Sequence, residues 1–225
     1  AETNASLRRA QQQLVMSEKL AAIGELTAGV AHEINNPVAV IQGNLDVLRE
    51  VLGPDAEPVR EEIRLIHQQA DRIRQIVTKL LQFARPGEFA GYVEAVDVNG
   101  LINDCLVLTR HNLEKREIEV HTRLEAGVGI EINRSELQQV LINLIVNAVQ
   151  AMPNGGRLEL ASADWFEDGL RLGTVIHVSD TGQGIAGEDL DRIFDPFFTT
   201  KKGSGTGLGL SISYTIIQRY GGRIT

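Results

Sequence analysis

The sequence predicts two unlike structural units, a helical hairpin that ends at residue 85 and an α/β domain that begins at residue 97. From residue 23 to residue 85 the apolar side chains recur every three or four positions, which is the spacing of one helix face. Beyond residue 97, helical spacing alternates with short strand-like runs. Residues 86–96, between the two, mix glycine, proline and charge, so we expect a linker there.

The composition is that of a water-soluble globular protein, and it excludes several classes of function. The 225 residues carry 22 basic and 30 acidic side chains, a formal net charge of −8, so we expect no nucleic-acid partner. Cys105 is the single cysteine, which excludes an intrachain disulfide. The sequence contains no apolar run long enough to cross a bilayer, so we expect membrane attachment only through segments outside this chain.

Two helices are expected in the first unit. One carries its apolar stripe over residues 23–52 and stops at Gly53-Pro54, and the other spans residues 59–84 and stops before Pro86-Gly87. Two helices alone bury little apolar surface, so we expect two chains to pair into a four-helix bundle. Residues 1–22 place apolar side chains a heptad apart, which predicts either a coiled-coil lead-in or a frayed, exposed helix.

The second unit is expected to combine three helices with several short strands. Helices are predicted at 97–111, 133–151 and 208–220, and strands at 117–124, 128–132, 157–163, 174–179 and from 223 onward. The strands at 117–124 and 128–132 are expected to pair with each other. Asn133 and Glu136 have the spacing of a capping box, in which each side chain bonds the other residue's backbone N–H.

His32 is the first candidate for chemistry. It lies on the helix face opposite the apolar stripe, beside Glu33 and one turn before Asn36, and Pro37 follows within the same predicted helix. A proline inside a helix costs about 3 kcal/mol, and such local violations are typical of working sites. An exposed imidazole beside a carboxylate suits a nucleophilic nitrogen, and the alternative is a surface histidine without a role.

Three patterns in the second unit suit a bound nucleotide. Asn143 and Asn147 lie four residues apart on an apolar helix, as oxygen ligands for Mg²⁺ or as amides that cap the core. Asp180 opens a glycine-rich turn after a strand, where an acid can accept a hydrogen bond from an exocyclic amine such as that of adenine. The glycine-rich run 203–211 precedes a helix, whose N-terminus suits phosphate. This run lacks the lysine of a P-loop and the preceding strand of a dinucleotide fold.

Five segments together resemble the sequence boxes of two-component sensor histidine kinases, in the family's order. SEKLAAIGELTAGVAHEINNP (17–37) resembles the phosphoacceptor box, ELQQVLINLIVNAVQAM (136–152) the asparagine box, VSDTGQGI (178–185) the first glycine box, FDPFFTTK (194–201) the phenylalanine box and GTGLGLSIS (205–213) the second glycine box. The HEINNP form is similar to the subgroup that contains nitrogen-regulation and dicarboxylate-sensing kinases.

The resemblance implies a fold and a domain plan. Residues 23–85 would be the dimerisation and histidine phosphotransfer domain, a helical hairpin that forms a four-helix bundle in the dimer, preceded by a signalling helix at 1–22. Residues 97–225 would be the catalytic domain, an α/β sandwich of the Bergerat (GHKL) ATP-binding type with a mixed sheet under three helices. The family continues beyond Thr225 by a strand or two, so this domain is expected to be incomplete at its C-terminus.

The resemblance also implies roles for single residues. His32 would be the phosphoacceptor, Glu33 its proton-handling partner, and Asn36 would orient water when a response regulator is dephosphorylated. Asn147 would be the magnesium ligand, with Asn143 near the phosphates. The residues implied for the nucleotide pocket, its lid and its phosphate loop are Asp180, Gly182, Gly184, Phe194, Lys201, Gly205, Gly207 and Gly209.

Two details modify this assignment. Some subfamilies place a basic residue three positions after the second asparagine, where this chain has Gln150, so Lys201 and Lys202 are the candidates for charge against the triphosphate. Phe194, with Phe197 and Phe198, has plain packing as an alternative to a role in the lid.

The resemblance therefore implies a kinase core in the cytoplasm, as part of a membrane-anchored sensor, that uses Mg²⁺ and ATP to phosphorylate His32. The phosphoryl group would pass to an aspartate on the receiver domain of a response regulator, with the phosphatase reaction as a second activity. The alternatives are a GHKL-type ATPase, which usually carries a catalytic glutamate where this helix has amides, and a non-catalytic scaffold that binds nucleotide.

Overall fold

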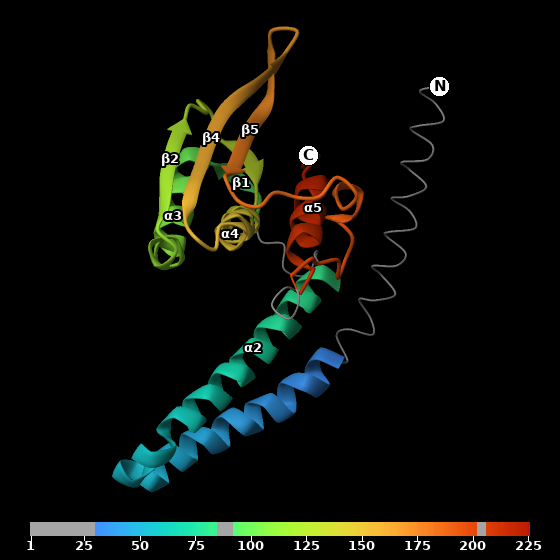
Figure 1. Ribbon diagram of the computed structural model, residues 1–225. Helices are drawn as coiled ribbons and strands as arrows, with labels where there is room; N and C mark the ends of the chain where they lie inside the picture. Colours follow the sequence, from blue (N-terminus) through green and yellow to red (C-terminus); the bar gives the residue numbers. More distant parts are fainter. Residues whose placement is uncertain (1–29, 85–91, 202–205) are drawn as a thin grey trace. The chain divides into compact units, whose positions relative to one another are not determined.

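The computed structural model describes residues 30–84, 92–201 and 206–225. The chain divides between residues 89 and 90 into two compact units, and each is treated by itself (Figure 1). The predicted lead-in at 1–22 and most of the predicted linker lie outside the described residues. Within the described ranges, no helix combines the length and the apolar character that a membrane span requires.

The first unit is a helical hairpin. A helix covers residues 30–52, the 3₁₀ helix η1 covers Gly53–Val59, and α2 covers Arg60–Ala84. Gly53 has a φ of +48°, a left-handed conformation that glycine adopts at little cost, and Pro54 follows in the first turn of η1. The predicted stop at Gly53-Pro54 is therefore correct, and a 3₁₀ helix makes the connection.

Two polar contacts fix the register of the hairpin. Gln42 donates from Nε2 to Asp71 Oδ1 at 2.8 Å, and His67 Nε2 lies 3.1 Å from Asp46 Oδ1. A step of four residues forward in the first helix matches a step of four residues back in α2. The two helices are therefore antiparallel.

Each apolar stripe of the hairpin divides into two sets that repeat every seven residues. One set is buried between the two helices and comprises Ala31, Val38, Leu45, Ile63, Ala70 and Val77. The other set is exposed and comprises Ile41, Leu48, Val59, Ile66 and Ile73. One hairpin thus covers about half of the stripe that the sequence pattern contains.

The second unit is an α/β sandwich. Its strands are β1 (Glu94–Val96), β2 (Ile118–Leu124), β3 (Ile130–Ile132), β4 (Gly156–Glu167) and β5 (Leu170–Asp180), and its helices are α3 (Val98–Lys115), α4 (Arg134–Ala151) and α5 (Gly209–Arg219). The main sheet has the order β2-β4-β5, in which β2 is parallel and β5 antiparallel to β4 (Figure 1). The mixed sheet matches the predicted sandwich.

The core of this unit lies between the main sheet and the apolar faces of α3 and α4. Leu158 and Leu160 alternate along β4 toward this side, and both are fully buried with Ile102 of α3 and Ile145 of α4. Full burial of one such side chain contributes about 1.5–3 kcal/mol. The core thereby holds α4 firmly against the sheet, and α4 carries the amides of the candidate site.

Residues 94–96 and 128–132 differ from the prediction. β3 does not pair with β2; it pairs with β1, which occupies the last residues of the predicted linker. A Cβ at Gly129 would lie 2.9 Å from the Val96 carbonyl oxygen, so glycine permits the chain to pass close to β1. The linker therefore ends before Glu94. A strand with one buried residue, Val96, is too short to show a period of two.

The β4–β5 hairpin is longer than predicted, and the predicted C-terminal strand is absent from the described residues. Asp168 and Gly169 form the two-residue turn between β4 and β5, with φ values of +50° and +77°, as a type I′ turn requires. A bulge beside Trp165 breaks the alternation, which explains why the pattern ended early. Residues 223–225 have no strand partner in the part of the chain that the structure describes, so the strand predicted from 223 onward is wrong.

Candidate functional site

His32 lies on the exposed face of the first helix, as the helical phase predicts. Glu33 and Asn36 are also exposed, whereas the neighbouring Ala31 is buried within the hairpin. The helix continues without a break through Pro37, which removes one backbone donor in the turn that contains Glu33. The three predicted residues are therefore brought together on one accessible surface, where the imidazole can meet a partner.

Three amide side chains follow one another along one face of α4. Asn143, Asn147 and Gln150 stand at positions i, i+4 and i+7, and the two asparagines are half-buried. Asn143 donates from Nδ2 to Ser213 Oγ of α5 at 2.9 Å, and Gln150 Oε1 accepts from Lys201 Nζ at 2.6 Å. Asn147, between them, makes no side-chain hydrogen bond to any residue that the structure describes.

The N-terminus of α5 packs against Asn143. A Cβ at Gly209 would lie 2.2 Å from Asn143 Oδ1, so any larger residue there would displace the Asn143 side chain. The N-cap position is held by Leu208, which makes no side-chain cap. Among the described residues, no side chain caps the first N–H groups of α5, and a helix end of this kind favours an anion.

Asp180 ends β5 and begins the turn that lies against the C-terminus of α4. Its Oδ1 accepts from the Gly182 backbone N–H at 2.8 Å, and Gln183 N donates to the Ala151 carbonyl oxygen at 3.2 Å. A Cβ at Gly182 would lie 2.6 Å from that same oxygen. Gly184 has a φ of +70°, so both predicted glycines are required, one by space and one by backbone conformation.

Residues 193–208, which we call the lid, connect the Asp180 turn region to α5. Phe197 N donates to the Gly207 carbonyl oxygen at 3.0 Å, and a Cβ at Gly207 would lie 2.3 Å from the Phe197 carbonyl carbon. Phe194 stacks on Tyr214 of α5 with ring centroids 5.1 Å apart. Packing is therefore the contact that Phe194 makes. Predicted Gly205, together with Lys202, lies outside the described residues.

Lys201 reaches from the lid to the face of α4. It is half-buried, and this burial lowers the pKa of its ammonium group, while the negative charge of Asp180 acts in the opposite direction. From the sequence, Gln150 was noted only because some subfamilies have a basic residue at this position. Its hydrogen bond to Lys201 was not predicted. The available signal was its spacing, which continues the row of amides by three residues.

Glu136 ties the other end of α4 to α5. The capping box is half correct, because Asn133 Oδ1 accepts from Glu136 N at 3.0 Å. The Glu136 carboxylate instead accepts from Arg219 at 2.5 Å and from the Tyr220 hydroxyl at 2.6 Å. Burial, and then this hydrogen bond, raises the pKa of Tyr220. Because Asn143 bonds Ser213 and Glu136 bonds Arg219, α4 and α5 lie antiparallel.

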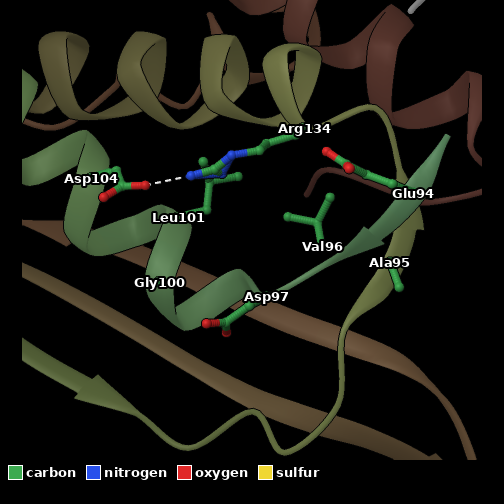
Figure 2. A pocket seen from close by; sticks show the side chains of 8 residues that line it. All are labelled: Glu94, Ala95, Val96, Asp97, Gly100, Leu101, Asp104 and Arg134. Atoms are coloured by element: carbon green, nitrogen blue, oxygen red, sulfur yellow. Dashed lines mark hydrogen bonds and ion pairs between the residues drawn. The ribbon is translucent and has the colours of Figure 1, made fainter. Parts of the chain in front are cut away.

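A separate cavity of about 300 Å³ lies near the N-termini of α3 and α4. Figure 2 shows its lining, which comprises Glu94, Ala95, Val96, Asp97, Gly100, Leu101, Asp104 and Arg134. Arg134 is paired with Asp104 across it, and Asp97 is occupied as the N-cap of α3. None of the predicted site residues lines this cavity, and the two on α4, Asn143 and Asn147, lie in the C-terminal half of that helix, away from Arg134.

Comparison with known proteins agrees with this division. Residues 22–89 match the His Kinase A (phospho-acceptor) domain, and residues 132–225 match the histidine kinase-, DNA gyrase B-, and HSP90-like ATPase family. The solved catalytic domain of histidine kinase ThkA is 31% identical, with a TM-score of 0.50 over 58% of this chain and 82% of that one.

The chain belongs to the sensor histidine kinases.

Among the relatives of this histidine kinase is sensor histidine kinase ZraS of Escherichia coli K12, 38% identical over 215 residues, 95% of this chain and 44% of that protein. The kinase AtoS of the same organism is 34% identical over 219 residues, 96% of this chain and 34% of that protein. The chain thus spans less than half the length of these relatives.

Two larger structures resemble both units. ThkA in complex with the response regulator protein TrrA is 30% identical, with a TM-score of 0.61 over 96% of this chain and 61% of that one. Full-length ShkA in complex with AMPPNP is 27% identical, with a TM-score of 0.71 over 87% of this chain and 41% of that one. The predicted order of helical hairpin and GHKL-type domain is therefore confirmed for this histidine kinase.

Proposed function

We propose that this chain transfers the γ-phosphoryl group of ATP to His32 and then to an aspartate on a response regulator. The observation that carries the proposal is the exposed imidazole on a phosphoacceptor hairpin, joined in one chain to an ATPase-type unit. The names of its relatives and the complex of ThkA with TrrA support the same reaction.

ATP would bind along the row of amides on α4. A carboxylate oxygen of Asp180 would accept a hydrogen bond from the exocyclic amine of adenine. It lies beside the turn that Gly182 and Gly184 shape. The uncapped N-terminus of α5, at Gly209, would meet the phosphates with its N–H groups, and Gly207 keeps the lid close to it. Lys201 would add positive charge. The AMPPNP complex of ShkA supports the binding of ATP.

The residues present fit a magnesium ion beside the phosphates. Amide and carboxylate oxygens are the ligands that Mg²⁺ prefers, and the half-buried Asn147 amide has no hydrogen-bond partner among the described residues. Asn143 donates from Nδ2 to Ser213 and its Oδ1 packs against Gly209, so Asn147 is the residue that would hold the ion. When bound, Mg²⁺ would neutralise part of the charge of the triphosphate.

The acceptor side of the transfer would be formed by the side chains around His32. A nitrogen of the neutral imidazole attacks the γ-phosphorus, the bond from that phosphorus to the bridging oxygen breaks, and ADP leaves. Glu33, the next residue, would take up the proton that the imidazole loses from its other nitrogen. Asn36, one turn on, would orient a water molecule for the separate phosphatase reaction, in which the response regulator is dephosphorylated. The exposure of all three residues supports access by both partners.

A second copy of this chain is the partner that we propose for the hairpin. The exposed set of the apolar stripe repeats every seven residues on both helices, as a four-helix bundle requires. We further place the kinase core in the cytoplasm, where ATP is available, as part of a membrane-anchored sensor.

The test is phosphorylation of the full chain with γ-labelled Mg-ATP. Wild type should gain an acid-labile label that His32→Gln lacks, whereas His121→Gln, on an exposed histidine of β2, should label normally. Label in His32→Gln would refute the assignment. Unchanged ATP hydrolysis in His32→Gln, without any phosphorylated wild-type protein, would favour a GHKL-type ATPase.

A further inference from the structure

The lid is held to α4 by the side chain of Lys201. Its Nζ lies 2.6 Å from Gln150 Oε1, across 51 positions of sequence. Gln150 is itself exposed, so its side chain contributes little to the core. Its hydrogen bond to Lys201 joins α4 to the lid. The contact therefore needs an explanation other than packing.

The position of Gln150 places this contact beside the nucleotide residues. It is one turn beyond Asn147 on the same face of α4, and Ala151, the next residue, touches the turn of Asp180 through Gln183 and Gly182. The Lys201 ammonium therefore bonds a residue one turn from the proposed Mg²⁺ ligand and adjacent to the contact with the Asp180 turn. The negative charge of Asp180 also attracts this ammonium and acts to raise its pKa, against the effect of burial.

We propose that Gln150 is a positioning residue, which holds the Lys201 ammonium so that it faces the triphosphate of ATP. The proposal rests on the ATP-dependent function proposed above. An ammonium has three N–H donors, and Gln150 Oε1 engages one, which leaves two for phosphate oxygens. Because an amide is neutral, Gln150 fixes the cation without cancelling its charge. A glutamate at the same position would hold the lysine equally well and would neutralise it.

This difference between holding and neutralising gives the proposal a sharp test. We would measure the Kd of Mg-AMPPNP for the full chain, together with KM for ATP and kcat of autophosphorylation, in Gln150→Ala, Gln150→Glu and Lys201→Met. Lys201→Met should raise Kd about tenfold or more, since it removes a charged hydrogen-bond donor. Gln150→Ala should raise Kd about three- to tenfold, and Gln150→Glu at least as much, although glutamate restores the acceptor.

Coupling between the two positions separates positioning from a structural role. In the double variant Gln150→Ala, Lys201→Met, the loss should equal that of Lys201→Met alone, because there is no ammonium left to position. Gln150→Lys should partly rescue Lys201→Met, because it returns a positive charge to the same place. Lys115→Met, which removes an exposed lysine at the end of α3, is the matched control and should bind as wild type.

Three results would overturn the proposal. These are a Gln150→Ala variant with unchanged Kd and KM, additive losses in the double variant, and a Gln150→Glu variant that binds as wild type. A wild-type chain that binds no Mg-AMPPNP would contradict the proposed function instead. A chain that binds it and labels His32, while Gln150→Ala has no effect, contradicts the positioning role alone.

Discussion

Replacement of Gly182 by alanine tests the geometry of the adenine turn most directly. The new Cβ would lie 2.6 Å from the Ala151 carbonyl oxygen and 2.7 Å from both the Ala151 Cβ and Asp180 Oδ1. Ordinary contacts begin near 3.4 Å, so the turn must withdraw from α4 by about 0.8 Å. Because two of these three atoms belong to a helix packed on the core, the turn, rather than the helix, must move.

The magnitude follows from these contacts. Overpacking of this kind costs about 1–3 kcal/mol, and withdrawal also lengthens the 3.2 Å bond from Gln183 N to Ala151. The movement displaces the Asp180 carboxylate, which Gly182 N holds at 2.8 Å. If ATP binding must reverse the displacement, its affinity falls by about 5- to 150-fold.

The assay is equilibrium binding of a fluorescent ATP analogue in the presence of Mg²⁺, with displacement by ATP. Gly187→Ala is the matched control, because this glycine lies in the same segment with open space around its Cβ position and no positive φ. We expect Gly187→Ala to bind as wild type. The reasoning fails if Gly182→Ala binds as tightly as wild type, or if Gly187→Ala loses as much affinity.

Three more predictions concern the rest of the molecule. Glu136→Ala should lower the free energy of unfolding in urea by about 2–3 kcal/mol, near the lower end for a broken buried pair because the Arg219 side chain keeps 28% exposure. As a control, Glu114→Ala, on an exposed glutamate, should lower it by under about 1 kcal/mol. Equal losses in the two variants would contradict the role of Glu136. The Cys105 thiol, whose pKa burial raises to about 11, should react with a disulfide reagent at pH 8 only after unfolding, so rapid native labelling would contradict its burial. In light scattering, Ile66→Glu should convert the proposed dimer to a monomer, whereas Leu170→Glu, on the exposed tip of β5, should leave the mass unchanged. A dimeric Ile66→Glu would exclude this face as the interface.

Much of the fold could be predicted because local physics determines it. The helical period gave the hairpin, its stop at Gly53 and the exposure of His32, since all three depend on residues within a turn or two. β4 and α4 were predicted for the same reason, as long segments with a clear pattern. The ATPase-type fold was assigned from the resemblance of five segments to the family's sequence boxes.

The errors lie where distant segments decide the outcome. β1 and β3 are three residues each, and their pairing depends on the close approach of Gly129 to Val96 rather than on any period. Glu136 has the spacing of a capping box, yet its carboxylate bonds Tyr220, 84 residues away. Gln150 was noted only for the charge it lacks, because its partner is 51 residues further on. In each case a tertiary contact replaced the local one.

The contacts around α5 divide the proposed ATP site into a rigid side and a replaceable side. α5 is fastened to α4 by the bond of Asn143 to Ser213 and, at its C-terminus, by the bond of Arg219 to Glu136. Gly209, at the start of α5, also packs directly on Asn143, so the first N–H groups have a fixed position before any ligand arrives. The lid instead contacts α4 through Lys201, whose hydrogen bond to Gln150 a phosphate can share or replace. Mutations on the rigid side should therefore lower stability and affinity together, whereas those at Lys201 and Gln150 should lower affinity and leave unfolding nearly unchanged.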